Sequence, residues 1–149
     1  MIKAAYCDVE YADIYFELRA FADAWTAADE ATKAKYLYTA SAMIADYCYF
    51  EDAEGEMFVY DDATGSEAWL QDAACEQALY LLSLGKDPTA ADKKTTLGVK
   101  STDGTVFDKS FAADIPCVRC RQILENHGGV ISPSATAGNT GVGNISIYK

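Results

Sequence analysis

The stretch SEAWLQDAACEQALYLLSLG, residues 66–85, carries the clearest helical pattern in the chain. Ser66 is a suitable N-cap, and Gly85 is a suitable residue to end the helix. Between them, apolar residues recur at three- and four-residue steps, which places them in one stripe on a helix face. We therefore predict a helix that packs this stripe into a core. The stripe consists of Leu70, Ala74, Ala78, Leu81 and Leu82.

Two further helices are predicted before this stretch, over about residues 8–21 and 29–47, because apolar residues recur there at helical spacing. Trp25 lies in the connection between them, and its large apolar surface predicts that it fills the corner between the two helices. The pattern breaks at residues 50–65. This segment reads as an acidic turn, a short strand or plug over 57–60, and a loop.

After the central helix, the period of the sequence changes over residues 95–111. Two β-prone runs flank the dipeptide Asp103-Gly104, which is a strong signal for a β-hairpin. A single hairpin needs a surface to lie against, so we expect its apolar residues to contact the helices, a neighbouring subunit or the tail side of an assembly. These residues are Leu97, Val99, Val106 and Phe107.

A fourth helix is predicted over about residues 116–126, ended by Gly128-Gly129. Its two arginines, Arg119 and Arg121, are unusual in so acidic a chain. We expect them to form salt bridges with acidic residues elsewhere.

The same helix contains Cys117-Val118-Arg119-Cys120, the one pair of cysteines with motif spacing among the five in the chain. The favoured interpretation is two buried thiols that pack as small hydrophobes. A thiol-redox motif is the alternative, since a helix start favours the thiolate. A zinc site would need two more ligands, and the chain offers no second cysteine pair.

The last 20 residues, 130–149, differ in composition from the rest of the chain. Residues 132–143 are rich in Ser, Gly, Thr and Ala and cannot bury a core of their own. We therefore divide the chain into a helical domain, 1–129, and a flexible C-terminal arm with a strand-like tip, suited to adding to a partner's sheet edge. The alternative is a disordered tail without a role. The tip residues expected to contact a partner are Ile145, Ile147, Tyr148 and Lys149.

Composition narrows the classes of function. The 149 residues suit one domain, and acids outnumber bases by 23 to 12, which gives a formal net charge of -11. That charge argues against a surface that binds DNA or anionic membrane, since both need basic patches. No apolar run approaches the ~20 residues of a membrane span, and the N-terminus does not resemble a signal peptide. We expect a soluble intracellular protein.

Motifs for catalysis, metals and cofactors are missing from the sequence. It has no phosphate-binding or dinucleotide-binding glycine motif, no HExxH and no Gly-x-Ser-x-Gly elbow. His127 is the only histidine, which removes most general-base arrangements. Residues 50–65 lack the spacing of a calcium-binding EF-hand, so a solvated acidic loop is favoured. We expect no enzyme, no catalytic residues, no metal and no cofactor.

The order of these segments resembles the small head–tail connector (adaptor, or head-completion) proteins of tailed phages, some of which carry the label DnaT-like. The similarity covers about residues 6–126 and includes a Gly-containing hairpin and a last helix led by Ile-Pro. Residues 50–65 depart from it, because the family often has a Trp-Pro-Arg segment there. The matching stretches are Tyr6–Tyr15 (family E-x-A-D-x-Y), Trp25–Asp29, Thr39–Ala45 and Ala73–Leu82 (family A-x-C-E-x-A-x-x-L-L).

The resemblance implies a mainly α fold: a bundle of about four helices, one inserted β-hairpin and an extended C-terminal arm. It implies a structural protein of the virion neck, a ring of about twelve copies that docks on the portal protein and joins it to a tail or nozzle protein. Double-stranded DNA would pass through the lumen without specific binding, past acidic walls. Single-stranded DNA binding is disfavoured by the charge. The alternatives are an intracellular protein-interaction module and a CxxC thiol-redox protein.

Overall fold

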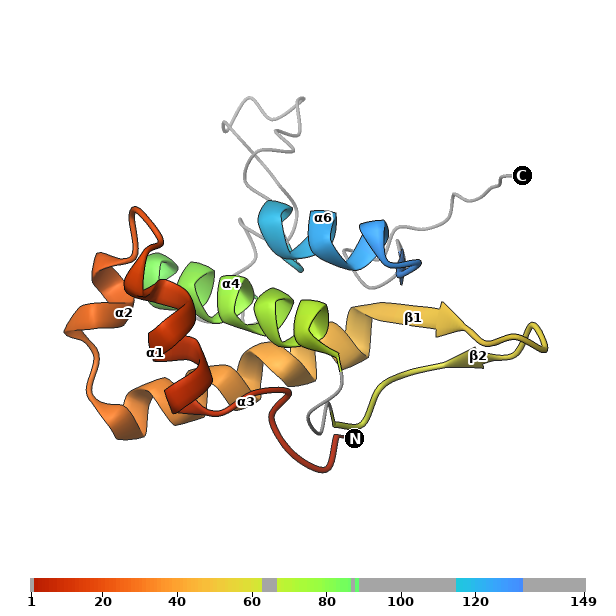
Figure 1. Cartoon of the computed structure of the whole chain (residues 1–149), viewed down its shortest axis with the longest axis horizontal. Coiled ribbons are helices and arrows are strands. Elements are labelled where there is room, and N and C mark those ends of the chain that lie inside the picture. The colour runs from red at the N-terminus through yellow and green to blue at the C-terminus, as the bar shows by residue number, and fades with distance from the viewer. Residues whose placement is uncertain (1, 63–66, 87, 89–114, 133–149) are drawn as a thin grey trace, which may run out of the picture.

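The computed structural model of the protein describes residues 2–62, 67–86, 88 and 115–132 (Figure 1). The described part is mainly helical with a small antiparallel sheet, which confirms the predicted fold class. The hairpin predicted over 95–111 and the arm residues from 133 onward lie outside the described residues. The helices are α1 (Val9–Glu17), α2 (Asp23–Ala27), α3 (Glu30–Tyr47), α4 (Ala68–Leu84) and α6 (Val118–Asn126), and the strands are β1 (Cys48–Glu51), β2 (Met57–Phe58) and β3 (Val130–Ile131).

Helix α4 is the centre of the fold, since α1, α2, α3 and α6 all pack against it (Figure 1). The predicted helix is confirmed, although its N-cap is Glu67 rather than the predicted Ser66, which lies outside the described residues. Gly85 ends the helix in the left-handed conformation with φ of 76°.

The sequence predicts one buried stripe on this helix, but the buried surface of α4 is wider than that stripe. Every residue from Ala73 to Leu79 is buried, because neighbours cover α4 on more than one side. Two polar residues, Glu76 and Gln77, are therefore buried with the apolar ones.

The corner between the first two long helices differs from the prediction. Helix α1 ends at Glu17 rather than near residue 21, and Phe21 has a positive φ of 62°, which is incompatible with a continuing helix. A short additional helix, α2, follows. Trp25 in α2 is buried, as predicted, and its indole Nε1 donates a hydrogen bond of 2.8 Å to Asp13 Oδ1.

The three strands form one sheet in the order β2-β1-β3, with antiparallel pairing throughout. The short strand predicted within 57–60 is β2, which pairs Phe58 with Phe50 of β1. Strand β3 corrects the expected start of the arm at residue 130. Val130 pairs with Tyr49, and Ile131 pairs with Cys48, so these two residues belong to the folded domain.

Gly129 explains why the chain after α6 can reach β1. A Cβ atom at this position would lie 2.7 Å from Cys48 Sγ and 2.9 Å from the carbonyl oxygen of Leu124. Only glycine permits this close approach between the end of α6 and the strand.

Candidate functional site

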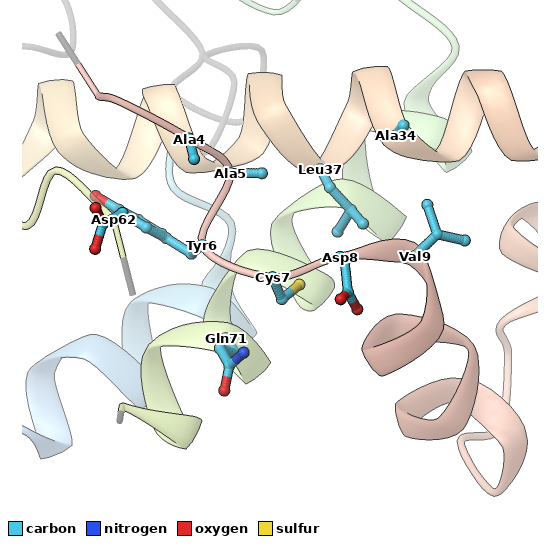
Figure 2. Close-up of a pocket in the computed structure, with 10 residues that line it drawn as sticks. All are labelled: Ala4, Ala5, Tyr6, Cys7, Asp8, Val9, Ala34, Leu37, Asp62 and Gln71. Atoms are coloured by element: carbon cyan, nitrogen blue, oxygen red, sulfur yellow. The ribbon is translucent and has the colours of Figure 1, made fainter. Parts of the chain in front are cut away.

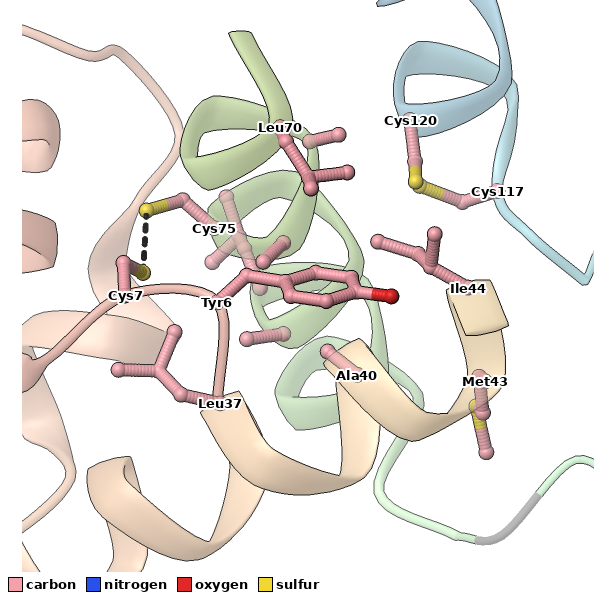
Figure 3. Packing of buried hydrophobic residues seen from close by; sticks show 14 of the residues in the cluster. Tyr6, Cys7, Leu37, Ala40, Met43, Ile44, Leu70, Cys75, Cys117 and Cys120 are labelled. Atoms are coloured by element: carbon pink, nitrogen blue, oxygen red, sulfur yellow. Dashed lines mark hydrogen bonds between the residues drawn. The ribbon is translucent and has the colours of Figure 1, made fainter. Parts of the chain in front are cut away.

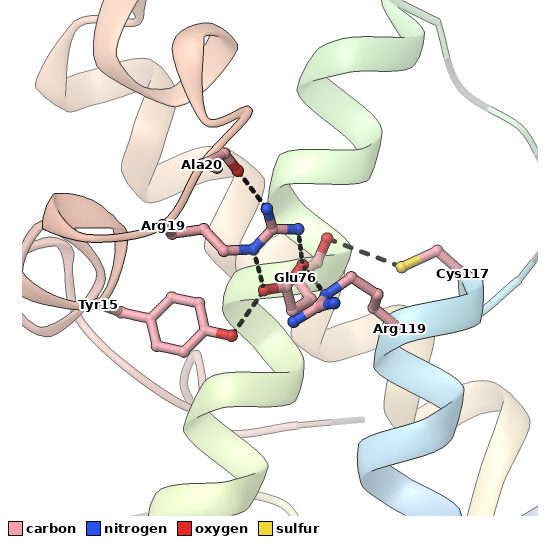
Figure 4. A network of polar contacts seen from close by, with 6 residues as sticks. All are labelled: Tyr15, Arg19, Ala20, Glu76, Cys117 and Arg119. Atoms are coloured by element: carbon pink, nitrogen blue, oxygen red, sulfur yellow. Dashed lines mark hydrogen bonds and ion pairs between the residues drawn. The ribbon is translucent and has the colours of Figure 1, made fainter.

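A buried carboxylate joins three helices at the middle of the molecule. Glu76 of α4 is 3% exposed, and four donor contacts surround it (Figure 4). The hydroxyl of Tyr15 donates to Oε2 at 2.6 Å, and Arg19 donates to both oxygens, through Nε at 2.9 Å and Nη2 at 3.0 Å. Arg119 of α6 approaches Oε1 with its Nε at 3.3 Å. We call these four residues the Glu76 cluster.

The electrostatics of the Glu76 cluster favour the ionised carboxylate. Burial by itself would raise the pKa of Glu76. The hydrogen bonds from Arg19 and Tyr15, with the positive charges of Arg19 and Arg119, outweigh burial and hold this pKa below its usual range. Both carboxylate oxygens are engaged by donors, so the arrangement suits a fixed structural ion pair rather than a proton-transfer group.

A groove of about 330 Å³ lies over the Glu76 cluster, between the loop after α1, the C-terminal half of α4 and the start of α6. Its apolar lining includes Phe21, Leu79 and Val118, and its charged lining consists of Arg19, Arg119 and Glu76. We call this the arginine groove. It combines apolar surface with guanidinium groups, a combination that is enriched at protein–protein interfaces.

Large apolar side chains are exposed on α1 and just after it, and one of them, Phe21, lines the arginine groove. Ile14 and Leu18 lie one helical turn apart and are 65% and 97% exposed, and Phe21 is 90% exposed. The positive φ of Phe21 costs conformational energy. The fold keeps this strained conformation although the side chain is not buried. Exposed apolar clusters of this kind mark interaction surfaces.

The opposite end of the molecule carries an acidic hairpin tip (Figure 1). The turn between β1 and β2 is fixed by Asp52, whose Oδ1 accepts hydrogen bonds from the backbone N–H groups of Glu54 at 2.9 Å and Glu56 at 2.8 Å. Gly55 supplies the positive φ of the turn, 85°. The side chains of Glu54, Glu56 and Met57 are exposed.

The sequence prediction of a solvated acidic turn is confirmed for residues 52–56. Its first two residues, Phe50 and Glu51, instead belong to strand β1, and Phe50 is buried.

Aromatic rings hold the base of this hairpin against the helices. Phe50 contacts the rings of Phe58, Tyr60 and Trp69 at centroid distances of 5.9, 5.1 and 5.5 Å. The His127 ring at the end of α6 stacks on Trp69 at 4.6 Å. The packing gives the hairpin a rigid base from which its acidic tip projects.

All five cysteines are buried and none forms a disulfide, as the favoured interpretation predicts. Figure 3 shows four of them, Cys7, Cys75, Cys117 and Cys120. Cys117 Sγ donates to the carbonyl oxygen of Glu76 at 3.7 Å, and burial raises the pKa of Cys120 well above its usual range. A redox motif needs a thiolate, which this burial opposes. Cys7 and Cys75 lie close together, with 3.7 Å between their sulfur atoms.

A second groove, of about 520 Å³, lies between the N-terminal segment, α3 and α4 (Figure 2). It is lined mainly by small and apolar residues such as Ala4, Ala5 and Leu37, with Asp8 and Asp62 as its acids. The Asp8 carboxylate already caps α1 by accepting from the N–H of Tyr11 at 2.8 Å. Within the described ranges, no group of three or more metal-ligating side chains is arranged to hold an ion.

Of the residues predicted for contacts, only Arg119 and Arg121 fall in the described part. Arg119 reaches an acid of its own chain, Glu76. Arg121 instead donates to the carbonyl oxygen of Pro116 at 3.4 Å, and its Nε is buried without a hydrogen-bond partner among the described residues. The others lie outside: Leu97, Val99, Val106, Phe107, Ile145, Ile147, Tyr148 and Lys149.

Sequence reasoning missed the Glu76 cluster and the arginine groove. A signal for the cluster was present, since Glu76-Gln77 interrupts an otherwise apolar run on the central helix, and a buried acid needs a cationic partner. Its partners Tyr15 and Arg19 are 57 or more positions away in sequence, and no local pattern connects them to α4.

No helix in the described part of the chain is long and apolar enough to cross a membrane. Comparison with protein-family models, with curated proteins and with solved structures finds no match to this chain.

Proposed function

We propose that the protein is a structural subunit of a phage neck, a head–tail connector whose copies form a ring on the portal and join it to the tail. The observation that carries the proposal is the set of large exposed apolar residues on α1 and just after it, Ile14, Leu18 and Phe21, of which Phe21 also lines the arginine groove. Exposing them in a lone subunit is unfavourable, whereas a ring contact or the portal would cover them.

The chemistry of the described residues supports an assembly role. Glu76, the buried acid, is saturated by donors and links α1, α4 and α6 into one rigid unit. Gln77 adds a second link, since its Oε1 accepts from the backbone N–H of Cys117 at 2.7 Å. Buried polar groups of this kind specify a unique packing, which a subunit needs if it is to present fixed surfaces to several partners.

The charge of the chain supports passage of DNA. A net charge of -11 per subunit makes a ring strongly anionic, and anionic walls repel the phosphate backbone. DNA that moves through such a lumen would not adhere to it. The proposal therefore places acidic residues on the channel wall, and a ring structure with a basic lumen would contradict this part of it.

The test is binding to the portal protein of the same phage. Full-length protein mixed with purified portal should give a complex that carries about a dozen added copies, measured by mass photometry. A chain shortened to residues 1–132 keeps β3 but lacks the proposed arm and should fail to dock. Absence of any full-length complex would contradict the proposal and favour a monomeric interaction module. Unchanged docking of the shortened chain would contradict the role of the arm.

A further inference from the structure

The arginine groove has the properties of a receptor for an acidic, partly apolar segment. The described contacts of Arg119 with its own chain use Nε, and its side chain is 58% exposed, so its terminal N–H groups remain available to a partner. Arg19 and Arg119 exceed Glu76 by one positive charge, in a chain whose net charge is -11. Val118, also 58% exposed, adds apolar surface at the rim.

The β1–β2 turn has the complementary properties. Glu54 and Glu56 present exposed carboxylates, and the neighbouring Met57 presents an exposed apolar side chain, 57% accessible. The backbone of the turn is held by its own hydrogen bonds to Asp52, so little conformational entropy is lost when it docks.

The two surfaces are well separated along the long axis of the molecule: the β1–β2 turn lies at one end, and the groove extends from the Glu76 cluster at the middle toward the other end. In Figure 1 the hairpin projects at one end, and the loop between α1 and α2, which forms part of the groove, lies at the other. The hairpin of a chain therefore has no access to its own groove. A contact between the two surfaces is head-to-tail, and repeated head-to-tail contacts close into rings when the rotation per subunit permits.

We propose that the arginine groove receives the β1–β2 turn of a second copy of the chain, with Glu54 and Glu56 facing Arg19 and Arg119 and with Met57 against Phe21 and Val118. The inference rests on the proposed function, in which copies form a ring, and it names the surfaces that make the ring contact.

Two full-length variants reverse the charge on either side of this contact. Glu54→Lys with Glu56→Lys changes only exposed side chains, because the turn uses the backbone of both residues. Val118→Glu with Ser83→Glu places two acids at exposed positions of the groove lining, so that the net charge of the groove changes from one positive to one negative. Val118 is the first residue of α6, where the helix dipole favours an acid.

Asp46→Lys with Glu125→Lys is the matched control for the turn variant. It also replaces two exposed acids by lysines, but on α3 and α6.

Association is measured by sedimentation velocity for the chain alone and by mass photometry on portal. Each charge-reversal variant alone should associate at least about tenfold more weakly than wild type, because like charges then face each other. An equimolar mixture of the two should assemble again. In a ring of alternating variants, each lysine-bearing turn meets an acidic groove and each acidic turn meets an unchanged arginine groove. The control should behave as wild type.

If both variants form the same rings on portal as the wild type, this inference is overturned and the proposed function stands. The same holds if both variants fail and their mixture is not restored. A different result would support the contact and contradict the proposed function. In that case the wild type associates without portal, each variant associates more weakly, the mixture is restored, and no form binds portal.

Discussion

The Glu76 carboxylate on α4 connects three other segments, because it meets donors from α1, the loop after α1, and α6. An ion pair this deeply buried is costly to break on one side only. Removal of the acid leaves two guanidinium groups without their partner, and Arg19 is only 21% exposed.

Substitution of Glu76 by Gln should therefore lower the free energy of unfolding by about 3 kcal/mol, measured by urea denaturation at pH 7. Glu125→Gln, at an exposed position in the last turn of α6, is the control and should change it by less than about 0.5 kcal/mol. Equal effects of the two substitutions would show that the cluster does not hold the helices together.

The lowered pKa of Glu76 also predicts a pH dependence. Because the pKa is lower in the folded state, the unfolded chain binds more protons between the two pKa values, and the contribution of Glu76 to stability falls with acid. This contribution is complete above the unfolded pKa, about 4.3, and is lost as pH falls through the folded pKa. The difference in stability between wild type and Glu76→Gln should narrow below about pH 4. A difference independent of pH would contradict the ionised cluster.

At the scale of elements, the end of the folded domain depends on β3. Ile131 packs against the core, and the backbone N–H of Ser132 donates to the carbonyl oxygen of Tyr47 at 2.8 Å. A chain shortened to residues 1–129 lacks these contacts, whereas one shortened to 1–132 retains them.

The shorter chain should unfold at a lower temperature than the longer one, by several degrees, corresponding to about 1–2 kcal/mol. Thermal unfolding followed by circular dichroism measures the difference. The full-length protein is the reference and should match the chain of residues 1–132. Equal melting of the two shortened chains would place the boundary of the domain at residue 129, as the sequence alone predicts.

Local patterns predict the long helices well, because the spacing of apolar residues and end signals such as Gly85 act within a few residues. Trp25 was correctly predicted to be buried from its size alone. Contacts between distant segments were not predicted. The pairing of Val130–Ile131 with β1 and the meeting of Arg19 with Glu76 depend on how helices are placed in three dimensions, and two-residue strands are too short to show a period.

At the scale of the whole molecule, the surplus of acid has two consequences. It argues against a surface that holds nucleic acid, and it leaves the arginine groove as a positively charged position on an anionic protein. Copies of such a chain carry like net charge and repel one another in general. The proposed contact between the arginine groove and the β1–β2 turn would join opposite charges, and so would favour a defined contact over nonspecific association.

The most direct test of the proposed ring is a cryo-EM reconstruction of the full-length protein mixed with portal of the same phage. We predict a closed ring of about twelve copies on the portal, with neighbouring subunits in head-to-tail contact and an acidic lumen. A reconstruction that shows the portal alone, or isolated copies bound without a ring, would contradict the account.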